Sequence, residues 1–102
     1  MFQRVCEALR GIDDLPGLTV SDVVGWGKGK GGDASDVVHE HGCAFVKKKK
    51  VELVVPSALT DRVVEVIAQA AHTGRVGDGK IFVHEVRSVV RIRTGERGEK
   101  GI

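Results

Sequence analysis

The most informative stretch of the sequence is Thr73-Gly74-Arg75-Val76-Gly77-Asp78-Gly79-Lys80-Ile81-Phe82-Val83. A helical apolar pattern ends just before it, and an apolar, β-branched run follows Lys80. A glycine-rich turn between a helix and a strand can direct several backbone N–H groups at one point, a geometry that binds phosphate oxygens. Glycine lets a ligand approach the backbone closely, and Lys80 would add positive charge. Taken alone, a Gly-Asp-Gly turn without a ligand explains the stretch equally well.

Two helices are predicted from apolar residues at helical spacing. The first covers about residues 2–9 and is closed by Gly11. The second has an apolar stripe over residues 59–70, with Ser57 as the expected N-cap and His72 near its end. Both patterns leave one polar face, so each helix is expected to pack against another layer of the domain.

Three strands are predicted from β-branched, apolar segments at 18–24, 46–55 and 81–86, the last continuing toward Ile92. Between the first two lies a long polar, glycine-rich loop over about residues 25–44, and loops of this length in small domains are usually functional or disordered. The order helix, strand, strand, helix, strand fits an α+β sandwich with helices on one face of a sheet.

Composition limits the functional classes. The 102 residues allow one domain, residues 1–102, and a core small enough that burial against sister subunits would help. A net charge of +2 is too small to indicate nucleic-acid binding, and the few aromatic residues are scattered, which disfavours base stacking on a sheet. Two cysteines make no disulfide framework, and no apolar run is long enough for membrane insertion, so a cytoplasmic location is expected.

A second basic segment near the end reads Arg91-Ile92-Arg93-Thr94-Gly95-Glu96-Arg97-Gly98. On a strand, Arg91 and Arg93 would point to the same face, and paired arginines suit bidentate contacts with phosphate. A solvated sheet edge is the alternative explanation. The run Lys47–Lys50 likewise suggests either an anionic ligand or a solvated strand face.

Together the two segments resemble one family. The pattern T-G-x-x-G-D-G-K-I-F-V followed by R-I-R-T-G-E-R-G-E looks like the B-loop and C-loop of PII signal-transduction proteins. Supporting matches are residues 17–20, 25–27 and 50–56. The resemblance covers essentially the whole chain, strongly from Lys48 to Glu99 and less so in the central loop.

This resemblance implies a trimer of ferredoxin-like βαββαβ subunits, with ATP or ADP in each cleft between subunits. It implies a T-loop at 28–47 that docks on a target transporter or enzyme, a B-loop at 73–80, and a C-loop and tail at 91–102. Nucleotide-dependent selection of T-loop conformations would carry the signal. The residues that match the family's nucleotide site are Thr19, Gly25, Gly27, Lys28, Lys48, Glu52, Val54, Gly77, Asp78, Gly79, Lys80, Arg91 and Arg93.

Three departures from the family pattern qualify these expectations. The family's first core strand, before the first helix, is missing or truncated, and a mis-assigned start at Met1 is the expected cause. Gly29 stands where the family has a glutamine that helps to hold magnesium and 2-oxoglutarate, so magnesium remains compatible with the site but 2-oxoglutarate is not expected to bind tightly. The chain has no tyrosine, and His41 occupies the position that some members uridylylate.

The sequence gives less support to two other functional classes. His39, His41 and Cys43 would share a face on an extended segment and are zinc-type ligands, so a trimeric metal-binding or metal-responsive protein is the alternative to a nucleotide-sensing regulator. A polar loop with incidental residues explains them as well. An enzyme is not expected beyond slow ATP hydrolysis, because neither paired carboxylates nor a nucleophile beside a base is evident.

Overall fold

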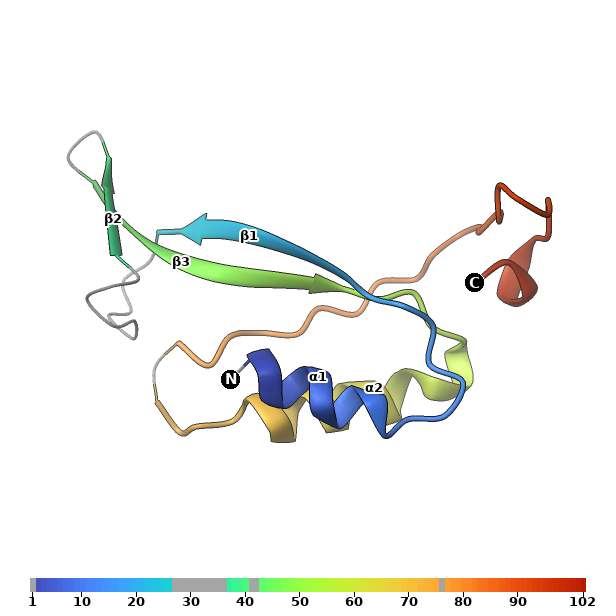
Figure 1. The fold of residues 1–102 in the computed structure, drawn as a ribbon, viewed down its shortest axis with the longest axis horizontal. Helices are drawn as coiled ribbons and strands as arrows, with labels where there is room; N and C mark the ends of the chain where they lie inside the picture. The colour runs from blue at the N-terminus through green and yellow to red at the C-terminus, as the bar shows by residue number, and fades with distance from the viewer. Residues whose placement is uncertain (1, 27–36, 41–42, 76) are drawn as a thin grey trace.

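The computed structural model describes residues 2–26, 37–40, 43–75 and 77–102, with backbone alone for 37–40 and 43–44. It is an α+β structure in which two helices lie beneath an antiparallel sheet (Figure 1). The elements in chain order are α1 (Phe2–Arg10), β1 (Thr19–Gly25), β2 (Val37–Glu40), β3 (Cys43–Glu52), the 3-10 turn η2 (Ser57–Leu59), α2 (Thr60–Ala71) and the 3-10 turn η3 (Gly98–Gly101).

The sheet has the order β1-β3-β2, and every pairing is antiparallel. β1 pairs along β3 from Thr19 opposite Glu52 to Gly25 opposite Val46. β2 pairs with the first part of β3, with Val37 opposite Val46. The long segment predicted to be a loop therefore contains part of a β-hairpin, because β-branched valines at 37 and 38 pair with β3.

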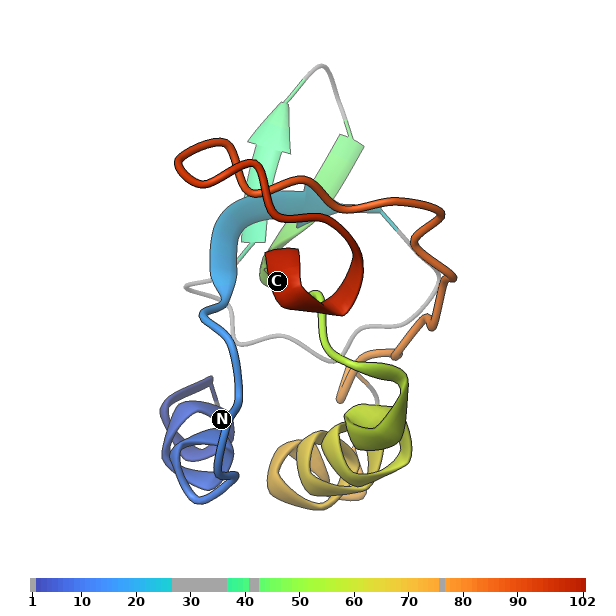
Figure 2. The same cartoon turned by 90° about the vertical axis from the view of Figure 1, so that its right-hand side faces the viewer.

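The helices α1 and α2 run antiparallel, side by side, on one face of the sheet (Figures 1 and 2). Their contact forms the core, which consists of Val5, Leu9, Ile12 and Val63, with Leu9 the most deeply buried. Partly buried residues of the helices and strand ends complete it. No helix in the described ranges is long and apolar enough to cross a membrane.

The predicted first helix, first strand and second helix are confirmed, with small shifts at their ends. The predicted N-cap is wrong: α2 begins after η2, its N-cap residue is Leu59, and no side chain caps it. Instead, the backbone N–H of Ser57 donates to Oε1 of Glu99 across 3.2 Å. The N-terminal end of this helical segment is thereby tied to the C-terminal turn.

The predicted third strand, residues 81–86, is not a strand in this structure. The segment runs extended alongside β3 on the side away from β1 (Figures 1 and 2). A strand requires a neighbour about 4.8 Å away to complete its backbone hydrogen bonds, and none of the described residues pairs with 81–86. Phe82 is consequently 74% exposed.

Candidate functional site

Four of the predicted site residues share one face of the sheet. The register places Thr19 directly opposite Glu52, and Gly25 and Lys48 lie an even number of residues away on the same two strands. The opposite face of β3 is turned toward the helices, because the ammonium group of Lys49 lies 5.9 Å from the centre of the Phe2 ring on α1. The candidate site therefore lies on the face of the sheet that points away from the helices.

On this face, the aliphatic part of the Lys48 side chain lies over Gly25. A Cβ atom built on Gly25 would lie 3.8 Å from Cδ of Lys48, so the aliphatic chain passes directly above the glycine. Farther along the same face, Nζ of Lys50 lies 3.1 Å from Oε1 of Glu52. Val54 follows beyond the strand end and is 39% exposed. This face of the sheet therefore has an apolar surface bordered by charged groups of both signs.

The glycine-rich turn after α2 has the backbone conformation that its sequence indicates. Gly77 and Gly79 have φ angles of +100° and +103°, which side chains rarely allow. A Cβ atom on Gly79 would meet nothing within 4 Å, so the space beside this backbone is open. Among the described residues, the amides of Gly77, Gly79 and Lys80 donate to no protein acceptor. Such amides beside an exposed lysine fit an anionic ligand such as a phosphate.

Asp78 lies between those glycines, but its carboxylate turns back into the turn. Its Oδ2 accepts hydrogen bonds from the backbone N–H groups of Thr73 at 2.8 Å and Gly74 at 3.0 Å. Its Oδ1 accepts from the Thr73 hydroxyl. The hydrogen bonds from the hydroxyl and then the N–H of Thr73 do most to lower the pKa of Asp78. Burial opposes them with a smaller effect, and Gly74 and then His72 lower the pKa further by lesser amounts. Thr73 is a partner that the sequence analysis did not identify.

The segment with the paired arginines is a turn rather than a strand. Residues 92–94 form the turn, which is closed by hydrogen bonds from the Arg91 N–H to the Glu96 carbonyl at 2.9 Å and from the Gly95 N–H to the Arg91 carbonyl at 2.7 Å. The expectation that Arg91 and Arg93 share a strand face is therefore wrong, because the chain reverses between residues 90 and 97.

Arg91 makes contacts within its own segment. Its Nη1 lies 3.4 Å from Oε1 of Glu96, and its Nη2 donates to the backbone carbonyl of Ile102. Arg93 is exposed. The carboxylate of Glu96 was not anticipated as a partner, although its position five residues after Arg91 in a glycine-containing turn is compatible with such a contact.

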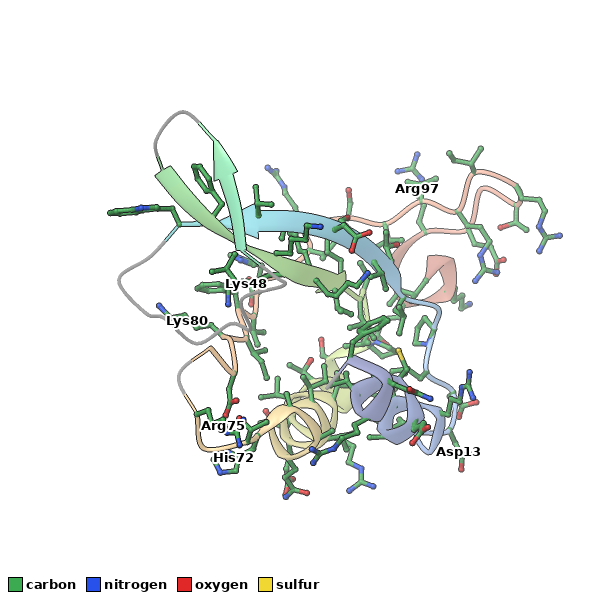
Figure 3. The ribbon with its side chains drawn as sticks, turned by 60° about the vertical axis from the view of Figure 1, so that its left-hand side comes forward. Asp13, Lys48, His72, Arg75, Lys80 and Arg97 are labelled. Atoms are coloured by element: carbon green, nitrogen blue, oxygen red, sulfur yellow. The ribbon has the colours of Figure 1, made fainter. Side chains whose placement is uncertain are left out.

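The two basic elements lie at opposite ends of the chain's fold. Figure 3 shows His72 and Arg75 beside the glycine-rich turn and Arg97 at the far end of the molecule, and Figure 1 gives the same separation. The longest extent of the chain is 47 Å. Lys80 and Arg91 of one chain therefore do not form a common site within that chain.

Several predicted residues lie outside the described part of the chain. They are Gly27 and Lys28 of the nucleotide site, Gly29, and His41 of the metal site, together with the side chains of His39 and Cys43. The described backbone places His39 opposite Ala44 and Glu40 opposite Cys43 in the β2–β3 hairpin. The metal site stays a prediction. Within the described residues, no three histidine, cysteine or acidic side chains are grouped as metal ligands.

The family model and the individual proteins that match this chain agree with one another. The family model described as nitrogen regulatory protein P-II matches residues 1–96. A nitrogen regulatory protein P-II of Rhodospirillum rubrum is 48% identical over 101 residues, which cover 99% of this chain and 89% of that protein. The corresponding protein of Azospirillum brasilense is 47% identical and the nitrogen regulatory protein GlnK of Escherichia coli 41% identical, with the same coverage.

Proposed function

Since the chain belongs to the P-II family of nitrogen regulatory proteins, we propose that it binds ATP or ADP between the subunits of a homotrimer and regulates a target protein through residues 28–47. Proteins of this family are non-enzymatic signal transducers in nitrogen regulation. The subunit proposed here is ferredoxin-like, the family's fold, and it acts in the cytoplasm as a single domain, residues 1–102.

The observation that carries the nucleotide proposal is the separation of the two basic elements along one subunit. A nucleotide polyphosphate is too short to join the glycine-rich turn to Arg91 across the length of the molecule. A neighbouring copy related by a rotation axis can bring its own arginine segment to the turn, and a head-to-tail contact of this kind closes into a ring. The site is incomplete without the second copy.

The geometry of each element supports the role proposed for it in the nucleotide site. The amides of Gly77, Gly79 and Lys80 and the lysine ammonium hold phosphate oxygens on one subunit. The sheet face with Lys48 and its neighbours lines the rest of the cleft, and Arg91 and Arg93 come from the adjacent subunit. To reach a phosphate, Arg91 must exchange its contact with Glu96 for one with the ligand.

For the second ligand, we propose that 2-oxoglutarate binds weakly or not at all. Gly29 provides no side-chain oxygen for magnesium, whose near-octahedral coordination depends on each oxygen ligand. A glycine at the base of the loop also increases the conformational entropy lost when a ligand orders that loop. Tight, ATP-dependent binding of 2-oxoglutarate in the presence of magnesium would show that position 29 does not limit this site.

For the target protein, we propose that residues 28–47 form the docking element. Nucleotide binding at the base of this segment would select among its conformations. Removing residues 29–44 should abolish capture of the target but leave the trimer and nucleotide binding intact. A deletion variant that still retains the target would contradict this assignment.

The test of the nucleotide proposal is calorimetry of the full chain with ATP, ADP and AMP, combined with sedimentation to determine the number of subunits. We expect a trimer that binds ATP and ADP, with AMP much weaker because it lacks the phosphates that the glycine-rich turn and the arginines would hold. A monomer, or equal binding of all three nucleotides, would contradict the proposal.

A further inference from the structure

A network of hydrogen bonds lies inside the glycine-rich turn. The carboxylate of Asp78 receives the backbone N–H groups of Thr73 and Gly74 and the hydroxyl of Thr73. The same hydroxyl oxygen accepts the backbone N–H of Arg75 at 3.2 Å. These bonds satisfy three consecutive amides after the end of α2 and join the two sides of the turn.

The network divides the amides of the turn into two groups. Those of Thr73, Gly74 and Arg75 are used internally. Those of Gly77, Gly79 and Lys80 have no acceptor among the described residues, and Gly77 and Gly79 flank Asp78 with positive φ angles. The internal hydrogen bonds hold the backbone on one side of Asp78. This determines the directions of the amides that have no internal acceptor.

The direction of the carboxylate argues against direct contact with a phosphate. Both oxygens of Asp78 are occupied by donors within the turn, and Nδ1 of His72 lies 3.7 Å from Oδ2. A carboxylate facing a phosphate would repel it, whereas the charge of a carboxylate that faces backbone N–H groups is stabilised by those donors. The side chain is 24% exposed, which agrees with this inward orientation.

We propose that Asp78 is a positioning residue, whose carboxylate acts with Thr73 to set the turn so that the amides of Gly77, Gly79 and Lys80 face the nucleotide phosphates, without that carboxylate contacting the nucleotide. This inference rests on the proposed nucleotide site and deepens it. It gives the Asp78 side chain a role other than the sequence-based expectation of holding phosphate, because its carboxylate oxygens are directed into the turn.

Conservative and disruptive substitutions at the two positions separate positioning from direct contact. Asp78→Asn keeps a carbonyl oxygen for the amides of Thr73 and Gly74 but removes the charge, whereas Asp78→Ala removes both. Thr73→Ser keeps the hydroxyl, and Thr73→Val removes it with nearly unchanged shape. Glu85→Gln is the matched control for charge, since Glu85 is exposed and makes no ion pair among the described residues.

Calorimetric titration with ATP should give a graded result. We expect Asp78→Ala and Thr73→Val to bind about tenfold or more weakly, the loss of roughly one charge-assisted hydrogen bond. We expect Asp78→Asn, Thr73→Ser and Glu85→Gln to stay within about threefold of the parent. Hydrogen exchange in the nucleotide-free protein should quicken at the Gly74 amide in Asp78→Ala and at the Arg75 amide in Thr73→Val, because each variant removes the acceptor of that amide.

The outcomes distinguish the two proposals. If the parent protein binds no ATP, the proposed nucleotide function is wrong. If the parent binds ATP and Asp78→Asn is as weak as Asp78→Ala while its Gly74 and Arg75 amides exchange at parental rates, an intact network does not support ATP binding and the positioning role is wrong. Parental affinity in Asp78→Ala would likewise overturn it, and the exchange rates show whether the network was in fact lost in that variant.

Discussion

The backbone N–H of Ser57 and the carboxylate of Glu99 are joined by a hydrogen bond of 3.2 Å, across 42 positions of the sequence. The bond connects the turn before α2 with η3, so it anchors the segment that carries Arg91 and Arg93 to the helical layer. The first turn of a helix has free N–H groups, and an acidic acceptor stabilises them. In this chain the acceptor comes from the opposite end of the sequence.

Glu99→Ala should loosen this anchor. We expect faster hydrogen exchange of the Ser57 amide and a loss of stability at the low end of the range for helix caps, about 0.5 kcal/mol, because the pair is exposed. Glu99→Gln is the matched control, since its carbonyl can still accept the bond. Exchange at Ser57 that is equal in all three proteins would mean that the bond does not persist in solution.

Gly79→Ala should destabilise the protein through the backbone alone. Gly79 has a φ of +103°, but a Cβ atom there would meet nothing, so the cost is conformational, about 1 kcal/mol. Gly17→Ala is the control, because Gly17 also has free space but no positive φ, and it should be neutral or slightly stabilising. Thermal unfolding of the two variants measures the difference. Equal midpoints would refute the conformational argument.

The stability of the parent should depend on pH through Asp78. Its folded-state pKa is lowered below the usual 3.8 by the Thr73 hydroxyl, then the Thr73 N–H, with further help from Gly74 and His72. Its contribution is therefore fully present above about pH 4 and is lost as the pH falls through the folded pKa. Denaturant unfolding of the parent and Asp78→Asn should show a constant difference at higher pH that shrinks below pH 3.8. A difference that grows on acidification would contradict the assignment.

The sequence predicts those elements whose partners are close in the chain or whose pattern is strongly periodic. The stripe through Leu59 and Val63 gives α2, and the glycines at 77 and 79 give a turn with positive φ angles. The local preference of a segment for strand conformation is not enough where a neighbouring strand is needed to complete the hydrogen bonds. Residues 81–86 have the composition of a strand, but no described neighbour completes their hydrogen bonds.

The candidate site shows the same contrast. Thr19 and Glu52 are assigned to the site by the family resemblance. The structure adds that they share a face, because strand residues paired directly across β1 and β3 point to the same side. Strand alternation would place Arg91 and Arg93 on one face, but this rule does not apply where the chain turns. The match to the family pattern assigns Asp78 to the phosphate site, whereas its hydrogen bonds to Thr73 depend on how the turn closes.

The central claim is that each nucleotide site is built from two subunits, and complementation tests it most directly. Lys80→Ala damages the glycine-rich turn, and Arg91→Ala with Arg93→Ala damages the arginine segment. Each variant alone should bind ATP at least about tenfold more weakly than the parent, because each loses charge-assisted contacts.

The decisive measurement is ATP titration of trimers that are reassembled from an equal mixture of these two kinds of subunit. In random assembly, about one cleft in four combines an intact turn with an intact arginine segment from its neighbour, so parental affinity should return in roughly that fraction of sites. No single subunit in the mixture has both elements intact. A mixture that shows only weak binding would contradict a site shared between subunits.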